Sequence, residues 1–220
     1  MTQPTVDDHF DEIGEYDSKA IFKPTVPALV VSKHEDEGPN IMTASWWMLA
    51  GYNPFRYLLA VSQKIYTHDL IEESGEFVLA APSTELIDAV TLAGMVSGRD
   101  IDKIDHLDLE TVPGKSVDVP LLADAVGNIE LSVMDSFEFE NTTYFFGSVE
   151  SAFVSKGALD GRILSLDADI LAYMGSDWAE EDAQSKHRFY ADLDPENLES
   201  FPGDEIIESL PPELREQVTD

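Results

Sequence analysis

Hydrophobic residues along this chain gather in short runs that predict β-strands, and polar residues, glycines and prolines separate the runs. Six runs are long enough to cross a sheet: 25–33, 40–51, 56–63, 76–82, 128–141 and 143–156. In the fifth run hydrophobic and polar residues alternate, so Ile129, Leu131 and Val133 should share one face of a strand. The turn between the last two runs is short, which predicts that they form a hairpin.

Two segments in the first half of the chain follow the spacing of a helix instead. In 66–77, Thr67 is expected to cap a short helix that ends at Gly75. A second helix is expected in 83–98, with Ser83 as its N-cap. Helices and strands do not alternate regularly, and no G-x-G-x-x-G motif follows a strand, which argues against a Rossmann fold. The pattern predicts a mainly β protein, an antiparallel β-barrel with short inserted helices.

Composition divides the chain into three parts. Residues 1–20 are polar and acidic, and 177–220 are acidic and interrupted by prolines. Residues 21–176 contain the predicted strands, and we expect them to form one domain, which the chain length allows. The acidic C-terminal extension is assigned no role.

The charge of the chain excludes some classes of partner. Lys and Arg number 13 and Asp and Glu number 44, which gives a formal net charge of −31. Binding to a nucleic acid backbone or to an anionic membrane requires a basic surface, so neither is expected. Acids spread along the whole chain are typical of salt-adapted proteins, in which high salt screens the self-repulsion. The alternative is an acidic protein from an ordinary cell.

Several kinds of chemistry have no support in the sequence. The chain has no cysteine, which excludes disulfides, thiolate metal sites and cysteine nucleophiles. Its five histidines form no compact pair of metal ligands, and no G-x-S-x-G or P-loop motif is present, so no metal site is predicted. The N-terminus lacks a basic start followed by an apolar run, and no stretch approaches the roughly 20 apolar residues of a membrane helix. The expected location is the cytoplasm.

The stretch "NIMTASWWML", Asn40–Leu49, combines hydroxyl groups with two tryptophans. On a strand, Thr43 and Ser45 point to the same face about 6.6–6.8 Å apart, and Met42, Ala44 and Trp46 point to the other. Such hydroxyls, with nearby backbone groups, can bind a polar planar ligand beside an apolar wall. A half-buried strand with chance hydroxyls would carry the same residues, and taken alone the stretch favours that simpler interpretation.

The stretch "SQKIYTHDLI" places Ser62, Gln63, Lys64 and Thr67 where a strand passes into a helix. The free N–H groups and partial positive charge of a helix N-terminus suit a phosphate, and Lys64 adds one of the few cations. An ordinary helix cap at Thr67 is the alternative.

The stretch "GMVSGRDIDK", Gly94–Lys103, brings Arg99 and Lys103 together beside small residues. Two cations flanking a loop in so anionic a protein indicate an anionic ligand. Local pairing with Asp100 and Asp102 is the alternative.

In this order, the three stretches resemble the flavin reductase-like family of FMN-binding split barrels. The resemblance runs from about Pro27 to Val154 and includes "ALVVSK" leading to "N-x-M-T-A-S-W", then "P-F-R-Y-L-L-A-V". It continues with "Y-T-H-D-L-I-x-x-S-G-E-F-V-L" and "S-G-R-D-I-D-K" and ends with "YFFGSVESAFV". No single motif is decisive, but the ordered set is specific.

The resemblance implies a split β-barrel that binds FMN non-covalently, as a homodimer with the flavin near the subunit interface. The first stretch would line the flavin, the second would approach the ribityl phosphate, and the third would close over the cofactor or its phosphate. The implied cofactor-binding residues are Asn40, Thr43, Ala44, Ser45, Trp46, Ser62, Gln63, Lys64, Thr67, Ser97, Gly98, Arg99 and Lys103. No catalytic residue is assigned.

The implied activity is electron transfer from NAD(P)H to flavin, or through bound FMN to an acceptor, with the cofactor carrying the chemistry. The alternatives are an FMN-binding electron carrier or flavin-binding module without efficient NAD(P)H turnover, and a barrel with another ligand or none. One departure concerns the phosphate. The family often has Arg or Lys one or two residues before the threonine, where this chain has Ile65 and Tyr66. Either Lys64 replaces that cation, or backbone and hydroxyl groups bind the phosphate alone.

Overall fold

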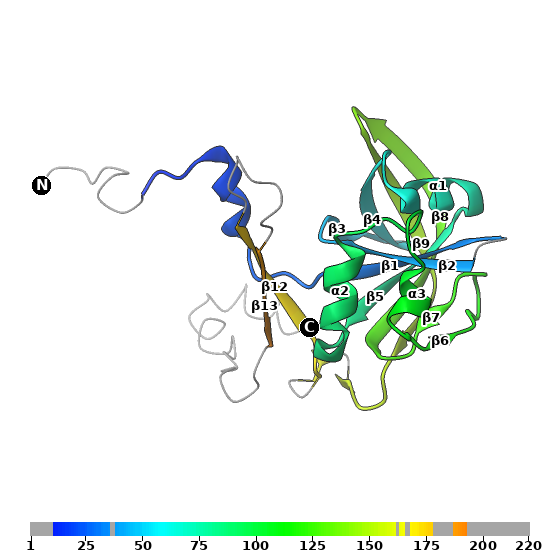
Figure 1. Cartoon of the computed structure of the whole chain (residues 1–220). Coiled ribbons are helices and arrows are strands. Elements are labelled where there is room, and N and C mark those ends of the chain that lie inside the picture. Colours follow the sequence, from blue (N-terminus) through cyan, green and yellow to red (C-terminus); the bar gives the residue numbers. More distant parts are fainter. Residues whose placement is uncertain (1–10, 36–37, 162, 166–167, 178–186, 193–220) are drawn as a thin grey trace, which may run out of the picture.

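The computed structural model describes residues 11–35, 38–161, 163–165, 168–177 and 187–192. Its centre is a seven-stranded antiparallel sheet in the order β2-β1-β5-β8-β9-β4-β3 (Figure 1). The strands are β1 (Ala28–His34), β2 (Gly38–Ala44), β3 (Trp47–Tyr52), β4 (Phe55–Ser62), β5 (Glu76–Pro82), β8 (Ala125–Phe139) and β9 (Thr142–Val154). The prediction of a mainly β, antiparallel fold with few helices is confirmed.

The sheet curls around a hydrophobic core on its inner face. Residues directly opposite each other on paired strands share a face, so Val30, Met42 and Leu79 all point inward. Leu59 and Phe145 reach the same core from the other half of the sheet. The two end strands, β2 and β3, are consecutive along the chain but do not pair with each other. The barrel is therefore split along this line, and β2 keeps one open edge.

The outer face of β2, β1 and β5 is covered by the rest of the chain. Leu29 and Val31 point outward there and are fully buried. The covering elements are η3 (Thr84–Leu86), α2 (Ile87–Ala93), α3 (Lys103–His106), β6 (Thr111–Val112) and β7 (Leu121–Leu122). Two buried polar side chains of β8 fix this covering layer. Asn128 bonds both backbone groups of Leu122 at 3.0 Å. The carboxylate of Glu130 accepts from the N–H groups of Lys115 (2.5 Å) and Ser116 (3.0 Å).

Smaller elements lie at the ends of the described chain. They are η2 (Glu15–Ala20), the pair β10 (Leu159–Asp160) and β11 (Ile163–Leu164), and the pair β12 (Leu171–Asp177) and β13 (His187–Asp192). The backbone of Thr25 pairs with that of Tyr173, which ties the N-terminal segment to β12. The division into 1–20, 21–176 and 177–220 stays a prediction, because residues 1–10, 178–186 and 193–220 lie outside the described residues. Among the helices that are described, none is long and apolar enough to cross a membrane.

Three local predictions were wrong. The run 40–51 is two strands, because the ladder of β2 ends at Ala44 and that of β3 begins at Trp47. Thr67 does not cap α1 (Tyr66–Ser74), since the N-cap is Ile65 and makes no side-chain hydrogen bond. The second helical segment is a 3-10 turn followed by α2. Ser83 stands at the N-cap position of that turn, as predicted, but its hydroxyl donates to the carbonyl of Asp124 and makes no cap hydrogen bond.

Candidate functional site

A cavity of about 250 Å³ lies beside the end of β2, where that strand has no neighbour. Its walls are the end of β2, the start of α1, the loop that follows α2, and Lys103 of α3. These elements are brought together because α1 and α3 both pack against β2. An unpaired strand edge carries free backbone donors and acceptors. The cavity therefore combines backbone polar groups, hydroxyls and two lysines with apolar walls.

Six of the predicted site residues line this cavity. They are Thr43, Lys64, Thr67, Ser97, Gly98 and Lys103. Asn40 lines a smaller adjoining cavity of about 180 Å³, which shares Tyr66, Gly98 and Lys103 with the first. The structure thus gathers residues from all three sequence stretches at one place.

Thr43 is fixed by α2. Its hydroxyl donates to the carbonyl of Val90 at 2.5 Å. Val90 lies in the last four residues of the helix, whose carbonyls have no partner within the helix. Since the hydroxyl proton is used there, the Thr43 oxygen can still accept a hydrogen bond from a ligand.

The neighbours of Thr43 divide between core and surface. Ala44 is buried in the inner core, and Ser45 and Trp46 are exposed in the link between β2 and β3. Trp47 packs on the same core, stacks at 6.1 Å on Tyr57 in a tilted arrangement, and donates to the carbonyl of Val26 at 3.2 Å. Trp47 is therefore a core residue. The side chain of Trp46 is 71% exposed.

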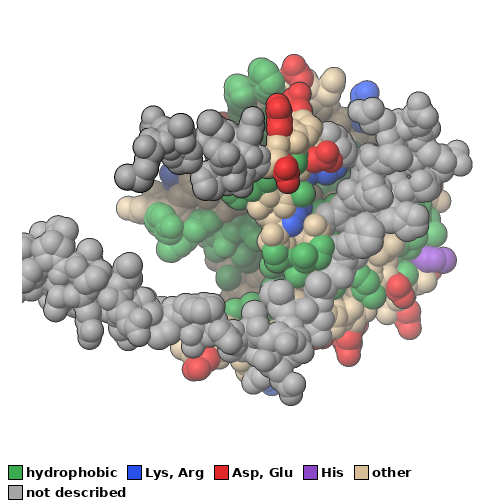
Figure 2. Space-filling model, turned by 90° about the vertical axis from the view of Figure 1, so that its left-hand side faces the viewer, with side chains coloured by type: hydrophobic (Ala, Val, Ile, Leu, Met, Phe, Trp, Pro, Cys, Tyr) green, Lys and Arg blue, Asp and Glu red, His purple; other side chains and the backbone are tan. Residues whose placement is uncertain are grey.

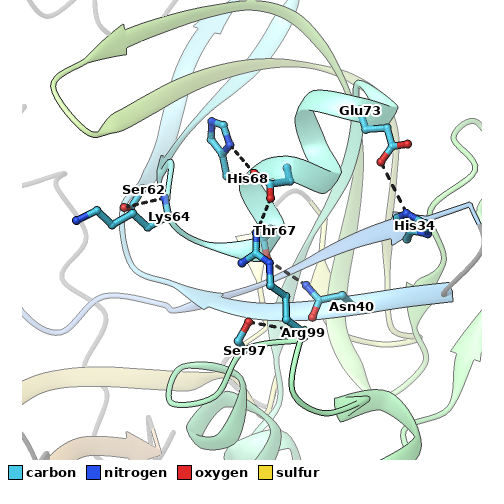
Figure 3. A network of polar contacts seen from close by, with 10 residues as sticks. His34, Asn40, Ser62, Lys64, Thr67, His68, Glu73, Ser97 and Arg99 are labelled. Carbon is cyan, nitrogen blue, oxygen red and sulfur yellow. Dashed lines mark hydrogen bonds and ion pairs between the residues drawn. The ribbon is translucent and has the colours of Figure 1, made fainter.

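Asn40 connects three elements. Its side-chain nitrogen donates to Thr67 at 3.0 Å (Figure 3). It donates more weakly to Ser32 at 3.4 Å. Its side-chain oxygen is buried and has no hydrogen-bond partner among the described residues. A buried carbonyl oxygen without a donor is costly, which marks this point as one where a ligand group or water would be stabilised.

The loop after α2 is held against α1 by close packing at Gly98. A Cβ atom at Gly98 would lie 2.1 Å from the Asn40 oxygen and 2.9 Å from the Tyr66 ring, so a larger residue there would displace these side chains. Arg99 reaches from the same loop to an ion pair with Asp69 (Figure 3), and its guanidinium lies 4.9 Å above the Tyr66 ring. Arg99 is therefore not paired with Asp100 or Asp102. Its charge is used to fasten the loop to α1.

Lys103 is the least exposed cation of the site, at 3%. Its ammonium group donates to the Val96 carbonyl at 3.2 Å and has no carboxylate partner among the described residues. Burial away from water lowers the pKa of Lys103 to about 8. Asp102, the local acid that could have paired with it, instead caps α3 through the N–H groups of Ile104 and Asp105.

Lys64 occupies the other side of the cavity. Its side chain is exposed, points away from α1 (Figure 3), and has no ion-pair partner in the part of the chain that the structure describes. The α1 N-terminus between the two lysines has no side-chain cap. The Lys103 ammonium group and the uncapped start of α1 at one cavity, with Lys64 at its edge, favour an anionic ligand group such as a phosphate.

Ser62 and Gln63 lie beside the cavity and do not line it. The Ser62 hydroxyl accepts from the Lys64 N–H at 3.5 Å and shapes the turn between β4 and α1. The Gln63 amide contacts the Thr143 hydroxyl at 3.4 Å, and the ring of His68 contacts the same hydroxyl at 2.9 Å. These contacts fix the start of α1 from the side of β9.

The cavity also has walls that sequence reasoning missed. They are Met42, Ile65, Tyr66, Ala93, Gly94, Met95 and Val96. The sequence signal that could have found them is position, since each lies within four residues of a predicted site residue. Ile65, Met95 and Val96 are also exposed apolar side chains, so the mouth of the cavity has an apolar rim.

A larger opening of about 350 Å³ lies elsewhere, and it contains none of the predicted residues. Its charged walls are Asp124, Lys156 and Asp169, and Asp169 already accepts from the Thr84 hydroxyl at 2.7 Å. No group of acids and histidines suited to a metal ion occurs among the described residues.

Residues 23–177 match the family described as the flavin reductase like domain. An uncharacterised protein of Pyrococcus abyssi is 34% identical over 152 residues, which are 69% of this chain and 86% of that protein.

Two solved structures share the fold. An FMN-binding protein from Thermus thermophilus, with bound 1-cyclohex-2-enone, has a TM-score of 0.68 at 23% identity, over 91% of this chain and 99% of that chain. The NADH:FAD oxidoreductase SgcE6 of Streptomyces globisporus has a TM-score of 0.57 at 21% identity, over 66% and 87%. At such identities the likeness concerns the fold alone.

Proposed function

The chain belongs to the flavin reductase-like family, and from this premise we propose that it is an oxidoreductase that binds FMN in the cavity beside β2. One observation carries the proposal. Predicted cofactor contacts from three separate stretches of the sequence line one cavity. The same cavity has two lysines, an uncapped helix start and an open strand edge. The FMN-binding protein from Thermus thermophilus supports the choice of flavin.

The residues present suit the chemistry of FMN. Lys103 and Lys64, with the first N–H groups of α1, would hold the dianionic phosphate. The unpartnered Asn40 oxygen would accept a hydrogen bond from a hydroxyl or N–H group of the ligand. Thr43 and the edge of β2 would bind the polar edge of the flavin ring, and Tyr66 and Met95 offer apolar contact. Ser45, Ser62, Gln63 and the other predicted contacts remain proposals.

A bound flavin supplies a ring that takes up and releases electrons, so the protein needs neither a metal nor a general base. The part of the chain is to bind, orient and shield that ring. Backbone donors of β2 would stabilise negative charge on the polar edge of the reduced flavin. We propose NAD(P)H as the electron donor, and the name of the Streptomyces globisporus oxidoreductase supports a nicotinamide donor.

The visible absorption spectrum of the protein, purified and titrated with FMN in high salt, tests the flavin proposal. Flavin bands that shift on addition of protein are expected. If no band and no response to FMN are observed, the flavin proposal is wrong. Oxidation of NADH and NADPH with FMN or FAD then tests the activity. If neither nucleotide reduces the flavin but a reduced protein does, the chain is an electron carrier, the second candidate.

A homodimer, a salt-adapted origin and a cytoplasmic location remain predictions.

A further inference from the structure

The amino group of Lys103 has chemistry beyond that of a fixed cation. Lys103 lines two adjoining cavities, of about 250 Å³ and about 180 Å³, and so borders open space on two sides. Its ammonium group donates to the Val96 carbonyl at 3.2 Å, and no carboxylate among the described residues accepts from it. An ammonium group buried without an anion loses its proton more easily than one in water.

Loss of that proton leaves a lone pair on the nitrogen. With a pKa of about 8, about half of Lys103 is neutral at pH 8, whereas a lysine at the ordinary value of 10.5 is only about 0.3% neutral. The neutral amine is the form that attacks a carbonyl carbon, and desolvation is one way in which proteins activate a lysine. A lower pKa also weakens a nucleophile, as it does for thiols, but by less than the gain in neutral amine.

The groups around the cavity favour an anionic reagent. Lys64 lies at the edge of the cavity, and α1 begins there without a side-chain cap. Two acids of the neighbouring elements are engaged in other contacts, since Asp102 caps α3 and Asp69 pairs with Arg99. A phosphate held by Lys64 and the first N–H groups of α1 would share the cavity with the amine of Lys103.

Elsewhere the surface of the protein repels anions. The chain has 13 lysines and arginines beside 44 acids. In Figure 2, acidic side chains spread over the face that is turned to the viewer, and Lys and Arg side chains appear at scattered points between them. Two of the eight lysines nevertheless line one cavity, which is therefore a favoured place for a small dianion.

We propose that Lys103 is a site of acylation by small acyl phosphates, which carry a carbonyl carbon and a phosphate in one molecule. Lys64 and the start of α1 hold the phosphate, and the neutral amine of Lys103 attacks the carbonyl carbon. A C–N bond forms, and the bond from the carbonyl carbon to the phosphate oxygen breaks. The phosphate leaves with the electron pair of that bond and takes up the proton that the amine releases. The step needs no oxidant or reductant.

Acylation changes the cavity as a binding site. The amide that forms is neutral, so the modified Lys103 no longer offers a positive charge to a phosphate. The effect on FMN rests on the proposed function, which assigns Lys103 to the phosphate of the flavin. FMN and an acyl phosphate then compete for one anion site, and bound flavin protects the lysine.

Peptide mass spectrometry of the full chain, incubated with acetyl phosphate at pH 8 in high salt, tests the proposal. Acetylation should be about tenfold faster at Lys103 than at Lys156, an exposed lysine outside the cavity that serves as a reference within each sample. Inorganic phosphate should slow the reaction at Lys103 and leave Lys156 unchanged. Acetylation of Lys103 that is no faster than that of Lys156, or that phosphate does not slow, would overturn the proposal.

Two variants at exposed side chains separate anchoring of the phosphate from reactivity of the amine. Lys64→Gln should slow acetylation of Lys103 by acetyl phosphate several-fold, but not acetylation by acetic anhydride, which carries no phosphate. Lys115→Gln removes an equal charge from a residue that contacts Glu130 through its backbone N–H, and it is the control. Equal rates in Lys64→Gln and Lys115→Gln would refute the anchoring of the phosphate at Lys64.

FMN binding is measured separately, so that failure of this inference and failure of the proposed function can be told apart. Protein acetylated at Lys103 should bind FMN about tenfold more weakly than unmodified protein, and saturating FMN should protect Lys103. Acetylation of Lys103 that phosphate slows but FMN does not would refute the proposed place of FMN and keep the modification site. FMN binding without selective acetylation of Lys103 would keep the proposed function and refute this inference.

Discussion

The buried ammonium group of Lys103 donates to one acceptor, the carbonyl of Val96. It also lines the cavity, where a ligand could supply further acceptors. Burial penalises the charged form and lowers the pKa of Lys103 to about 8. A phosphate beside the ammonium favours the charged form and would raise this pKa again. Binding of FMN and protonation of Lys103 are therefore linked.

This linkage predicts how FMN affinity depends on pH. Below pH 8 Lys103 is already protonated and binding is strongest, whereas above pH 8 a proton must be taken up on binding. The FMN dissociation constant should rise about tenfold between pH 7 and pH 9, measured by quenching of flavin fluorescence. Lys103→Arg keeps its charge over this range and should flatten the profile. Riboflavin, which lacks the phosphate, is the ligand control, and an equal slope for riboflavin would contradict the assignment.

The ligand-free protein should respond to pH with the opposite sign. A lysine with a pKa near 8 when folded and 10.5 when unfolded binds more protons in the unfolded state between those values. The free energy of unfolding therefore gains a contribution from Lys103 as pH rises through this window, while FMN affinity falls. The opposite signs distinguish the titration of Lys103 from a general loss of structure at high pH.

Thr43 and Ser45 are predicted to differ in their roles. The Thr43 hydroxyl is bonded to Val90 and lines the cavity, whereas Ser45 is exposed in the link after β2. The double variant Thr43→Val, Ser45→Val should weaken FMN binding by about 1–3 kcal/mol. Thr43→Val alone should also lower the free energy of unfolding by about 1 kcal/mol, because it leaves the Val90 carbonyl without a donor. Thr43→Ser is the control, and unchanged FMN affinity in the folded double variant would remove both residues from the site.

The sequence predicted which residues form the site better than it predicted which residues they contact. The spacing of "SGRDIDK" marked Arg99 and Lys103 as cations beside a flexible loop, but their partners, Asp69 and the Val96 carbonyl, depend on how α1 and the loop pack together. The same packing decides that Thr67 accepts from Asn40 instead of capping α1. The contact of Asn40 with Thr67 and that of Arg99 with Asp69 join residues 27 and 30 positions apart, which local periodicity cannot detect.

At the scale of the elements, the loop from Gly94 to Arg99 packs closely against β2 and α1 at Gly98. The Asn40 oxygen and the Tyr66 ring fill the space where a side chain at Gly98 would lie. The backbone of Gly98 is not in the left-handed region, so the demand for glycine there comes from space alone.

Gly98→Ala should therefore displace the loop. We expect a loss of about 1–3 kcal/mol in the free energy of unfolding and weaker FMN binding, measured by denaturant melts and by FMN titration. Gly14→Ala, where the added Cβ meets only Asp17 at an ordinary 3.5 Å, is the control. Shortening Asn40 in the double variant Gly98→Ala, Asn40→Ser should recover part of the loss, since the two residues are in contact. Full stability of Gly98→Ala would show that the loop is not held at this point.

Periodicity predicted the strands well and their ends less well. The alternation in 128–141 placed Ile129, Leu131 and Val133 on one face, and all three belong to the inner core. The break between β2 and β3 was missed, because Ser45 and Trp46 continue the β-type composition without a glycine or proline. The break arises where the split sheet changes from one end strand to the other, which is a property of the topology.

At the scale of the whole molecule, charge and hydrophobic surface are distributed separately. The described ion pairs are few beside the 44 acids of the chain, and its 13 lysines and arginines can balance only a part of the acidic charge. The 31 residues from Gly38 to His68 contain no Asp or Glu, and they supply the β2 and α1 walls of the cavity. Salt should therefore act by screening the repulsion among the acids that lie elsewhere on the chain.

The stability of the protein should depend strongly on salt. Raising KCl from about 0.1 M to about 1 M shortens the Debye length from about 10 Å to about 3 Å and removes most of the repulsion among exposed acids. We expect the melting temperature to rise by on the order of 10 °C, measured by calorimetry at one protein concentration. Undiminished stability of the protein in dilute buffer would contradict the salt-adapted interpretation.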